Sequence, residues 1–370
     1  MVSLSCPTPI PVDLALAGAL ERAAASIARL DQASALHPLL PALLYRARLE
    51  AVRQQAAVDG LAIDPWHLAA MIEGLRPRMD RALRIIDRGG IFDAARHALT
   101  LHGWLTAPDV GQEREIQGAQ AALGAADAGP APLLAAAAAT HAWLDRGCSR
   151  PPIRVALIRT WTRRGLIRAP FPLTGISALR PDAPWQPTAW AGAFLSALAD
   201  EADAERQRLT DMERAWFAAR GAVATRRRNS RAPAAVDILA AAPLISATSL
   251  AQGLGMAVKN AIALLDRFCV EGIAVEVTHR SKRRLFGLTG IAPLRDGVAA
   301  PRRPEPGRGR GRPRPRDTEP QAPPPPDRPL TPLERRAFDY GEIERWMTHA
   351  DQAIRNTRRT LLALAQAGKA

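Results

Sequence analysis

Apolar residues recur at helical spacing through most of the first 220 positions of the chain. Leu20, Ala24 and Ile27 return every three or four residues, which predicts one apolar helix face. A helix should begin at Asp64-Pro65, because aspartate caps a helix and proline suits its first turn. Further helical stretches are predicted over residues 39–57, 68–87, 91–106, 111–124, 132–146, 153–165, 188–202 and 204–222. The pattern predicts a mainly α fold.

Breaks in this pattern divide the chain into predicted segments. Residues 1–12 contain three prolines without periodicity, and residues 301–329 are dominated by proline, arginine and glycine. Such compositions cannot bury a core. The predicted segments are a flexible arm at 1–12, a helical domain at 13–221, a compact module at 232–294, a disordered basic linker at 295–330 and an amphipathic C-terminal helix at 331–368. A basic hinge over residues 222–231 should join the helical domain to the module.

The compact module carries the most specific pattern in the chain. Pro233 opens a short helix, Ser246 can cap a second, and a third is predicted over residues 257–271. Gly255 separates the second helix from the third, and glycine tolerates the left-handed backbone that a tight turn between helices needs. The pattern predicts a helix-turn-helix whose third helix enters the major groove of DNA with its N-terminal end.

The two faces of the predicted third helix differ in character. We expect its buried face to consist of Val258, Ile262, Leu265 and either Phe268 or Cys269. The opposite face carries Lys259, Asn260 and Ala263. Asparagine can bond two edges of adenine at once and lysine can reach guanine or phosphate, so Lys259 and Asn260 are candidates for base reading. The alternative is that both are ordinary solvated residues.

A two-stranded wing should follow the third helix. Residues 274–278 alternate, with Val275 and Val277 on one side and Glu276 and Thr278 on the other, and residues 284–288 can pair with them. The predicted tip carries four cationic side chains, namely Arg280, Lys282, Arg283 and Arg284. These cations could neutralise DNA phosphates, an attraction that salt weakens. The alternative is a solvated hairpin.

The segment Ser246–Leu288 contains SATSLAQGLGMAVKNAIALLDRF and EVTHRSKRRLFGL. It resembles the winged helix-turn-helix of an uncharacterised alphaproteobacterial family of helix-turn-helix DNA-binding proteins. Members of that family pair a helical domain of unknown function with this module, and the resemblance covers most of the chain. The module is also similar to the winged helix at the end of many Fic-domain proteins. The resemblance implies DNA binding and gives no regulated gene.

The placement of charge favours a polyanionic partner. The 370 residues carry a net charge of +14. Twelve basic and two acidic residues lie between positions 280 and 316, and four more arginines lie between positions 226 and 231. The excess positive charge therefore lies beside the module, which predicts double-stranded DNA as the partner.

An arginine-rich arm lies in the predicted linker. Arg310-Gly311-Arg312-Pro313 resembles the core of an AT-hook. Glycine lets the backbone lie in a narrow groove, proline keeps the chain extended, and arginines enter the A·T-rich minor groove. Minor-groove contacts are therefore predicted for Arg308, Arg310, Gly311, Arg312 and Arg314. The alternative is a low-complexity linker.

The predicted C-terminal helix has a heptad seam. Its apolar or small positions are three and four residues apart, at Tyr340, Ile343, Met347, Ala350, Ile354, Thr357, Leu361 and Leu364. The seam could join two chains in a homodimer, which would suit the reading of two half-sites. It could equally dock on the N-terminal domain.

Candidate chemistry is sparse. The three cysteines are far apart, so the sequence predicts neither disulfide framework nor zinc site. His141 and Asp145 faintly resemble the Fic signature, but the run from Arg146 to Ser149 lacks the Gly-Asn-Gly nest that would hold a nucleotide. The alternatives are a degenerate, non-catalytic Fic-like scaffold and an ordinary helix end with an exposed His141. We expect no enzyme activity and no cofactor.

The chain opens without a basic stretch followed by an apolar run, and no apolar run approaches the ~20 residues of a membrane span. We therefore expect a cytoplasmic protein without a membrane partner. The sequence predicts a DNA-binding transcriptional regulator or a maintenance factor of a plasmid or mobile element. The alternatives are a degenerate Fic-like nucleotide-transferase scaffold with an autoregulatory winged helix, and a nucleoid-type binder with weak sequence preference.

Overall fold

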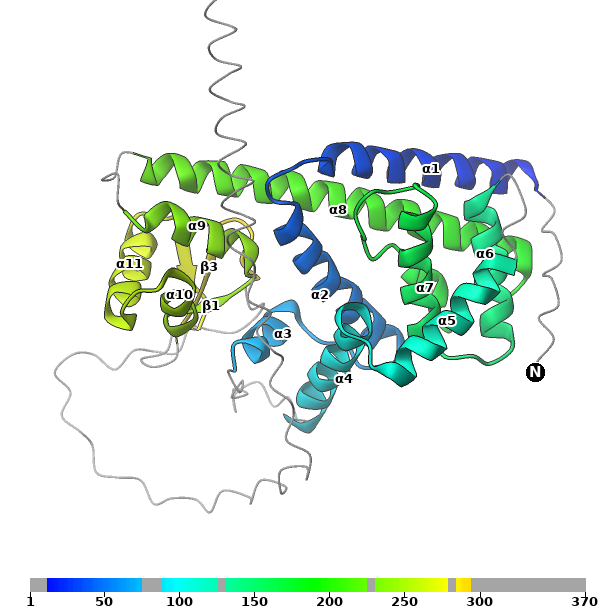
Figure 1. Cartoon of the computed structure of the whole chain (residues 1–370), viewed down its shortest axis with the longest axis horizontal. Helices are drawn as coiled ribbons and strands as arrows, with labels where there is room; N and C mark the ends of the chain where they lie inside the picture. Colours follow the sequence, from blue (N-terminus) through cyan, green and yellow to red (C-terminus); the bar gives the residue numbers. More distant parts are fainter. Residues whose placement is uncertain (1–11, 75–87, 126–130, 225–229, 279–283, 294–370) are drawn as a thin grey trace, which may run out of the picture. The chain divides into compact units, whose positions relative to one another are not determined.

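A computed structural model of the chain describes residues 12–74, 88–125, 131–224, 230–278 and 284–293. The described part is mainly helical, as the apolar spacing predicts (Figure 1). Its first eight α-helices are α1 (Leu14–Ser34), α2 (Leu40–Val58), α3 (Pro65–Ile72), α4 (Arg88–Thr106), α5 (Val110–Ala125), α6 (Pro132–Asp145), α7 (Arg150–Arg163) and α8 (Pro187–Val223). A short 3-10 helix, η2 (Ile176–Leu179), lies between α7 and α8.

The longest of these helices, α8, runs unbroken for 37 residues. The prediction of two helices, at 188–202 and 204–222, was wrong, because the polar residue between them faces a neighbouring helix. The Ser26 hydroxyl of α1 donates to the Asp203 carboxylate at 3.1 Å. Arg22 of α1 also pairs with Asp200. Figure 1 shows that α1 lies alongside α8 over most of the length of α1.

Local signals placed the start of α3 correctly. The Asp64 side chain accepts a hydrogen bond of 2.6 Å from the Trp66 backbone N–H, and Pro65 occupies the first turn. The helix ends at Ile72 and is followed by Gly74, whose φ of 70° is left-handed. Within the predicted stretch 68–87, the helix covers only residues 68–72 of the described positions. Positions 75–87 lie outside the described residues.

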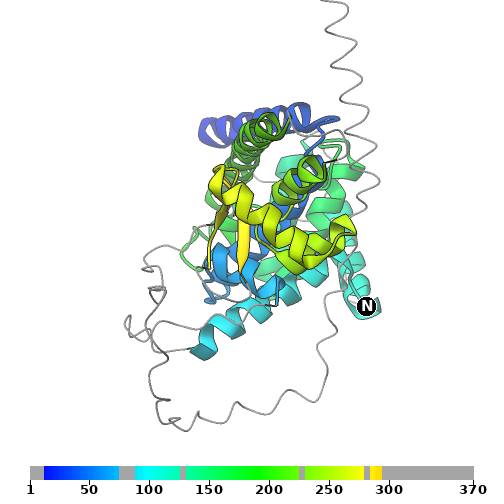
Figure 2. The same cartoon turned by 90° about the vertical axis from the view of Figure 1, so that its left-hand side faces the viewer.

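The C-terminal part of the described chain contains three helices and a small sheet. Its elements, in chain order, are α9 (Ala232–Ala241), β1 (Ile245–Ser246), α10 (Ala247–Leu254), α11 (Val258–Val270), β2 (Ala274–Glu276) and β3 (Leu285–Leu288). We call residues 232–293 the C-terminal module; it faces the viewer in Figure 2. The expected pairing of β2 with β3 is confirmed, with Glu276 opposite Phe286. The sequence did not predict β1, because a strand of two residues carries no periodic signal.

The sheet has the strand order β1-β3-β2, and both pairings of β3 are antiparallel. The turn signals between the helices are also confirmed. The Ser246 hydroxyl accepts from the Ser249 backbone N–H at 3.2 Å and caps α10. Gly255 has φ 61° and ψ 42°, the left-handed conformation that lets α11 follow α10 directly.

The described residues all belong to one compact unit, which spans residues 1–298. We predicted a boundary between the helical domain and the module at the hinge 222–231. That boundary stays a prediction, but the two parts are in contact through a buried cluster, in which Trp66 and Ala69 of α3 pack against Leu244, Val277 and Leu285 of the module. The module is thus anchored on the helical part. Residues 1–11 of the predicted arm at 1–12, the predicted linker at 295–330 and the predicted C-terminal helix at 331–368 lie outside the described residues.

Candidate nucleic-acid interface

The predicted base-reading residues lie on the outer face of α11. Lys259 and Asn260 are both exposed and belong to the first turn of this helix, and Ala263 is exposed one turn later. Ala257, at the N-cap, has no side chain that can accept a hydrogen bond from the first turn. The first turn of α11 therefore offers the Lys259 ammonium, the Asn260 amide and backbone N–H groups at a helix N-terminus, where anions are favoured.

The buried face of α11 confirms Leu265 and Phe268 of the predicted stripe but contains Ala261 in place of Val258 and Ile262. Ala261, Leu265 and Phe268 are buried, whereas Val258 and Ile262 are 42% and 41% exposed. Both sets of positions have helical spacing, so the apolar pattern alone could not choose between them. Ala261 is completely buried, and α11 packs against α10 and β2. Val258 and Ile262 consequently join Lys259 and Asn260 on the accessible side.

Arg284, predicted at the wing tip, is engaged within the module. Its guanidinium lies 2.6 Å from the Asp266 carboxylate, 2.8 Å from the Glu276 carboxylate and 4.8 Å from the Phe286 ring centroid. Desolvation acts against the charged form, but the bonds to Glu276 and Asp266 raise the pKa of Arg284 above its usual value. The structure thus places this cation between α11 and the two strands, not on a loop tip.

The other predicted contacts fall outside the described residues. They are Arg280, Lys282 and Arg283 of the wing, and Arg308, Arg310, Gly311, Arg312 and Arg314 of the arm. Their roles stay predictions.

Glu73, just after α3, fixes the start of α10. One of its carboxylate oxygens accepts from the Ser246 backbone N–H at 3.0 Å and from the Ser249 hydroxyl at 2.7 Å. A carboxylate at a helix N-terminus also interacts favourably with the helix dipole. Sequence reasoning missed this contact, because 173 residues separate Glu73 from Ser246.

Arg46 of α2 holds the module from a second direction. Its guanidinium donates to the backbone carbonyls of Ala240 and Ala242 at 3.0 Å each, and to that of Ile291 at 3.2 Å. The first two carbonyls lie at the C-terminal end of α9, and the third follows β3. Burial lowers the pKa of Arg46 to about 9, with a contribution from the nearby Arg208, so the side chain stays charged at neutral pH.

A third anchor joins α8 to α9. The Trp216 indole N–H donates to the Asp237 carboxylate at 2.8 Å, and the Arg220 guanidinium lies 3.0 Å from the same oxygen. With Glu73 and Arg46, these contacts orient the C-terminal module relative to α2, α3 and α8. The direction in which α11 presents its outer face is therefore set by the helical part.

The Fic-like segment does not present His141 to solvent. Only 9% of His141 is exposed, and its Nε2 lies 2.9 Å from the Trp185 carbonyl oxygen. The ring also contacts Trp185 and Trp190, with centroids 4.7 Å and 5.3 Å away. The expectation of an exposed His141 was wrong. Asp145, the matching acidic residue, is exposed at the end of α6.

Within the described ranges, no three His, Cys, Asp or Glu side chains gather as a metal site would require. Among the same residues, no helix combines the length and the apolar character of a membrane span.

In comparisons with known proteins, the chain matches no protein-family model, and no curated protein is significantly similar to it. The resemblances to the helix-turn-helix family and to Fic proteins stay predictions. The geometry of the module therefore carries the functional argument.

Proposed function

We propose that the C-terminal module is a winged helix-turn-helix and that the protein binds double-stranded DNA, with α11 in the major groove. The observation that carries this proposal is the exposure of Lys259 and Asn260 at the N-terminal end of a helix that directly follows a Gly255 turn. In helix-turn-helix proteins this end of the second helix of the motif contacts base edges.

The order of elements supports this assignment. A winged helix-turn-helix combines three helices with a small antiparallel sheet, in which a short strand after the first helix completes the hairpin of the wing. The order α9, β1, α10, α11, β2, β3 and the strand order β1-β3-β2 fit that description. The unpredicted strand β1 strengthens the assignment, since the sequence argument did not depend on it.

The packing of α11 leaves the interface accessible. Its main contacts are with α10 and β2, both within the module. The anchoring contacts of the helical part go to α9, to the start of α10 and to the strands. The helical part therefore contacts the module through elements other than α11, which leaves the outer face of α11 free to contact DNA.

The side chains on the outer face suit base recognition. Asn260 can form two hydrogen bonds with adenine, and Lys259 can reach guanine or phosphate. The small Ala263 permits close approach, and the half-exposed Val258 and Ile262 can contact a thymine methyl group. We infer that the protein is a transcriptional regulator or a maintenance factor of a plasmid or mobile element. In this proposal the wing and the arginine arm add phosphate and minor-groove contacts.

Selection of bound duplexes from genomic fragments, followed by affinity measurements on the enriched site, tests the proposal. Asn260→Ala should weaken discrimination at one base position by ~1–3 kcal/mol. Lys259→Ala should lower affinity and reduce the salt dependence by about one counterion. Arg114→Ala, which removes an exposed cation from α5, is the matched control and should change neither.

Two outcomes would contradict this function. Failure of the full chain to retain any duplex at low salt would remove DNA binding itself. Equal enrichment of all sequences, with no positional effect of Asn260→Ala, would leave a nucleoid-type binder and exclude base reading by α11.

A further inference from the structure

A cavity of about 460 Å³ lies where the helical part meets the C-terminal module. Residues of α2, α3 and α8 form one side, and Pro243, Gly290, Ile291 and Pro293 of the module form the other. Small-molecule sites commonly occupy ~300–1,000 Å³ and lie between packed units. The volume and the position of this cavity therefore suit a small ligand.

Charged side chains of α2 and α8 line the cavity. It is lined by three arginines, Arg46, Arg53 and Arg208, and by two carboxylates, Glu50 and Asp211. The lining thus carries one more positive than negative charge. Apolar walls include Leu49, Leu68, Met212 and Ile291. A ligand with one negative charge and an apolar body would match both features.

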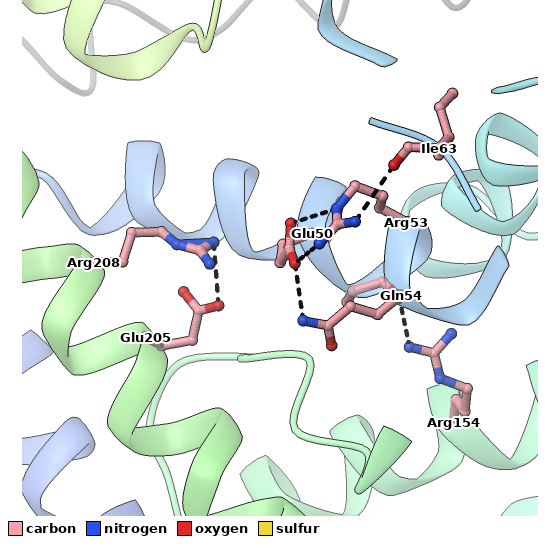
Figure 3. Close-up of polar contacts among 8 residues, drawn as sticks. Glu50, Arg53, Gln54, Ile63, Arg154, Glu205 and Arg208 are labelled. Carbon is pink, nitrogen blue, oxygen red and sulfur yellow. Dashed lines mark hydrogen bonds and ion pairs between the residues drawn. The ribbon is translucent and has the colours of Figure 1, made fainter. Parts of the chain in front are cut away.

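Three of the lining charges are already neutralised. Arg53 forms a two-pronged pair with Glu50, at 2.9 Å and 2.5 Å (Figure 3). Asp211 lies 3.2 Å from the Arg214 guanidinium. The remaining lining cations are Arg46, whose three bonds go to neutral carbonyls, and Arg208.

The guanidinium of Arg208 has more N–H donors than its ion pair uses. Its one ion pair among the described residues is with Glu205, at 3.3 Å, whereas a guanidinium carries five N–H donors. Figure 3 shows Arg208 reaching from α8 toward α2, between Glu205 and Glu50. Glu205 is only 7% exposed, and its Oε2 has no hydrogen-bond partner in the described part of the chain. Burial raises the pKa of Glu205 to about 7, so at neutral pH this carboxyl only partly balances Arg208.

The geometry points to an effector site for a small monocarboxylic acid, whose carboxylate binds Arg208 and whose apolar body lies against Leu68, Met212 and Ile291. A guanidinium matches a carboxylate in a bidentate geometry, which gives the site its preference for this group. The second negative charge of a dianion would find only Arg46, which is buried and already donates to three carbonyls.

This site is placed to act on the module. Ile291 contributes both a wall of the cavity and the carbonyl that Arg46 binds, and it follows β3 by three residues. A ligand there would bias the position of β3 and, through the sheet, of α11. The regulatory part of the inference rests on the proposed DNA binding, and coupling between the two ligands must be reciprocal.

Calorimetry and thermal unfolding of the full chain test the site without DNA. Acetate, butyrate, octanoate and phenylacetate are the probes, with phenylacetamide as the uncharged match of phenylacetate and phenyl phosphate as the dianion. At roughly 10 mM, phenylacetate or octanoate should raise Tm by about 3 °C, as expected for a millimolar Kd. The amide and the phosphate should have smaller effects. Equal effects of phenylacetate and its amide, or no shift with any carboxylate, would overturn the site.

Two variants make the test specific. Arg208→Gln should lower the affinity for the tightest-binding carboxylate at least tenfold. Ala204→Leu should lower it as much, because the larger side chain fills the cavity without altering its charge. Arg114→Gln on α5 is the control and should bind as the parent does. Retained affinity in both Arg208→Gln and Ala204→Leu would place the ligand elsewhere and overturn the assignment.

DNA affinity measured with and without the bound carboxylate tests the coupling separately. A change of threefold or more that disappears in Arg208→Gln is expected. An unchanged DNA affinity would overturn the regulatory part and leave the site standing. Absence of DNA binding would refute the proposed function, while the calorimetry would still decide the site.

Discussion

The Nε–H of Arg46 donates a hydrogen bond of 3.0 Å to the carbonyl oxygen of Ala240, across 194 positions of sequence. This contact joins the middle of the helical part to the last turn of the first helix in the C-terminal module. Helix-end carbonyls have no partner inside their own helix, so a buried guanidinium is well suited to satisfy them. The two halves of the described chain are thus connected through a polar group at the centre of their interface.

Removal of this guanidinium should destabilise the protein. Arg46→Met keeps much of the side-chain volume but leaves the carbonyls of Ala240, Ala242 and Ile291 without their donor. Each unsatisfied buried group costs ~1–3 kcal/mol, offset in part because a buried charge is also removed, so we expect a net loss of about 2 kcal/mol. Urea unfolding measures it. Arg96→Met, at an exposed ion pair, is the control, and an equally small loss in both variants would contradict this role.

The stability of the protein should depend on the protonation of Glu205. Burial raises its pKa from 4.5 to about 7 in the folded state. Between these pH values the folded chain keeps a proton that the unfolded chain releases, so this group makes the free energy of unfolding fall as pH rises. Glu205→Gln should remove that fall and gain about 3 kcal/mol at pH 8 relative to the parent.

Thermal unfolding between pH 5 and pH 8 checks this prediction. The difference between variant and parent isolates Glu205 from other groups, such as His102, whose pKa burial lowers to about 4. Glu115→Gln, at an exposed position of α5, should leave the pH profile unchanged. Parallel profiles for Glu205→Gln and the parent would show that the carboxyl ionises normally.

The assignment of faces on α11 can be tested by stability alone. Leu265 is fully buried, whereas Ile262 is 41% exposed. Leu265→Ala should therefore cost about 3 kcal/mol, and Ile262→Ala less than about 1 kcal/mol. Chemical unfolding of the two variants measures the difference. A reversed order would mean that α11 is rotated relative to the structure, and that Lys259 and Asn260 are not on its outer face.

Replacement of Arg284 and replacement of Lys259 should affect different quantities, the stability of the fold and the salt dependence of DNA affinity respectively. Arg284→Gln removes an ion-pair partner of the Glu276 carboxylate, which is only 9% exposed, and should cost about 2 kcal/mol of stability. Lys259→Ala should leave stability unchanged but reduce the slope of log affinity against log salt by about 1. DNA titrations over a salt series, combined with unfolding curves, distinguish the two. A reduced slope for Arg284→Gln would mean that Arg284 reaches phosphate after all.

Much of the local structure could be predicted because its causes lie within a few residues. Asp64 and Ser246 cap the helices that follow them, and Gly255 makes the turn, since each acts on its immediate neighbours. Helix α8 shows the limit of this reasoning. The sequence analysis placed a boundary at position 203, whereas Asp203 lies inside α8 and accepts a hydrogen bond from the Ser26 hydroxyl of α1.

The sequence by itself determined that the described part of the chain is mainly helical and where most of its helices begin, because helical periodicity relates apolar residues three or four positions apart. It also placed Lys259 and Asn260 away from the buried face of α11. Tertiary structure decided which of two apolar stripes of α11 is buried, that Arg284 is paired inside the module, and that Arg46 and Glu73 anchor the module to the helical part. It also created the cavity beside Arg208. Each of these features joins residues distant in sequence, and their pairing depends on how the helices pack, which no local pattern records.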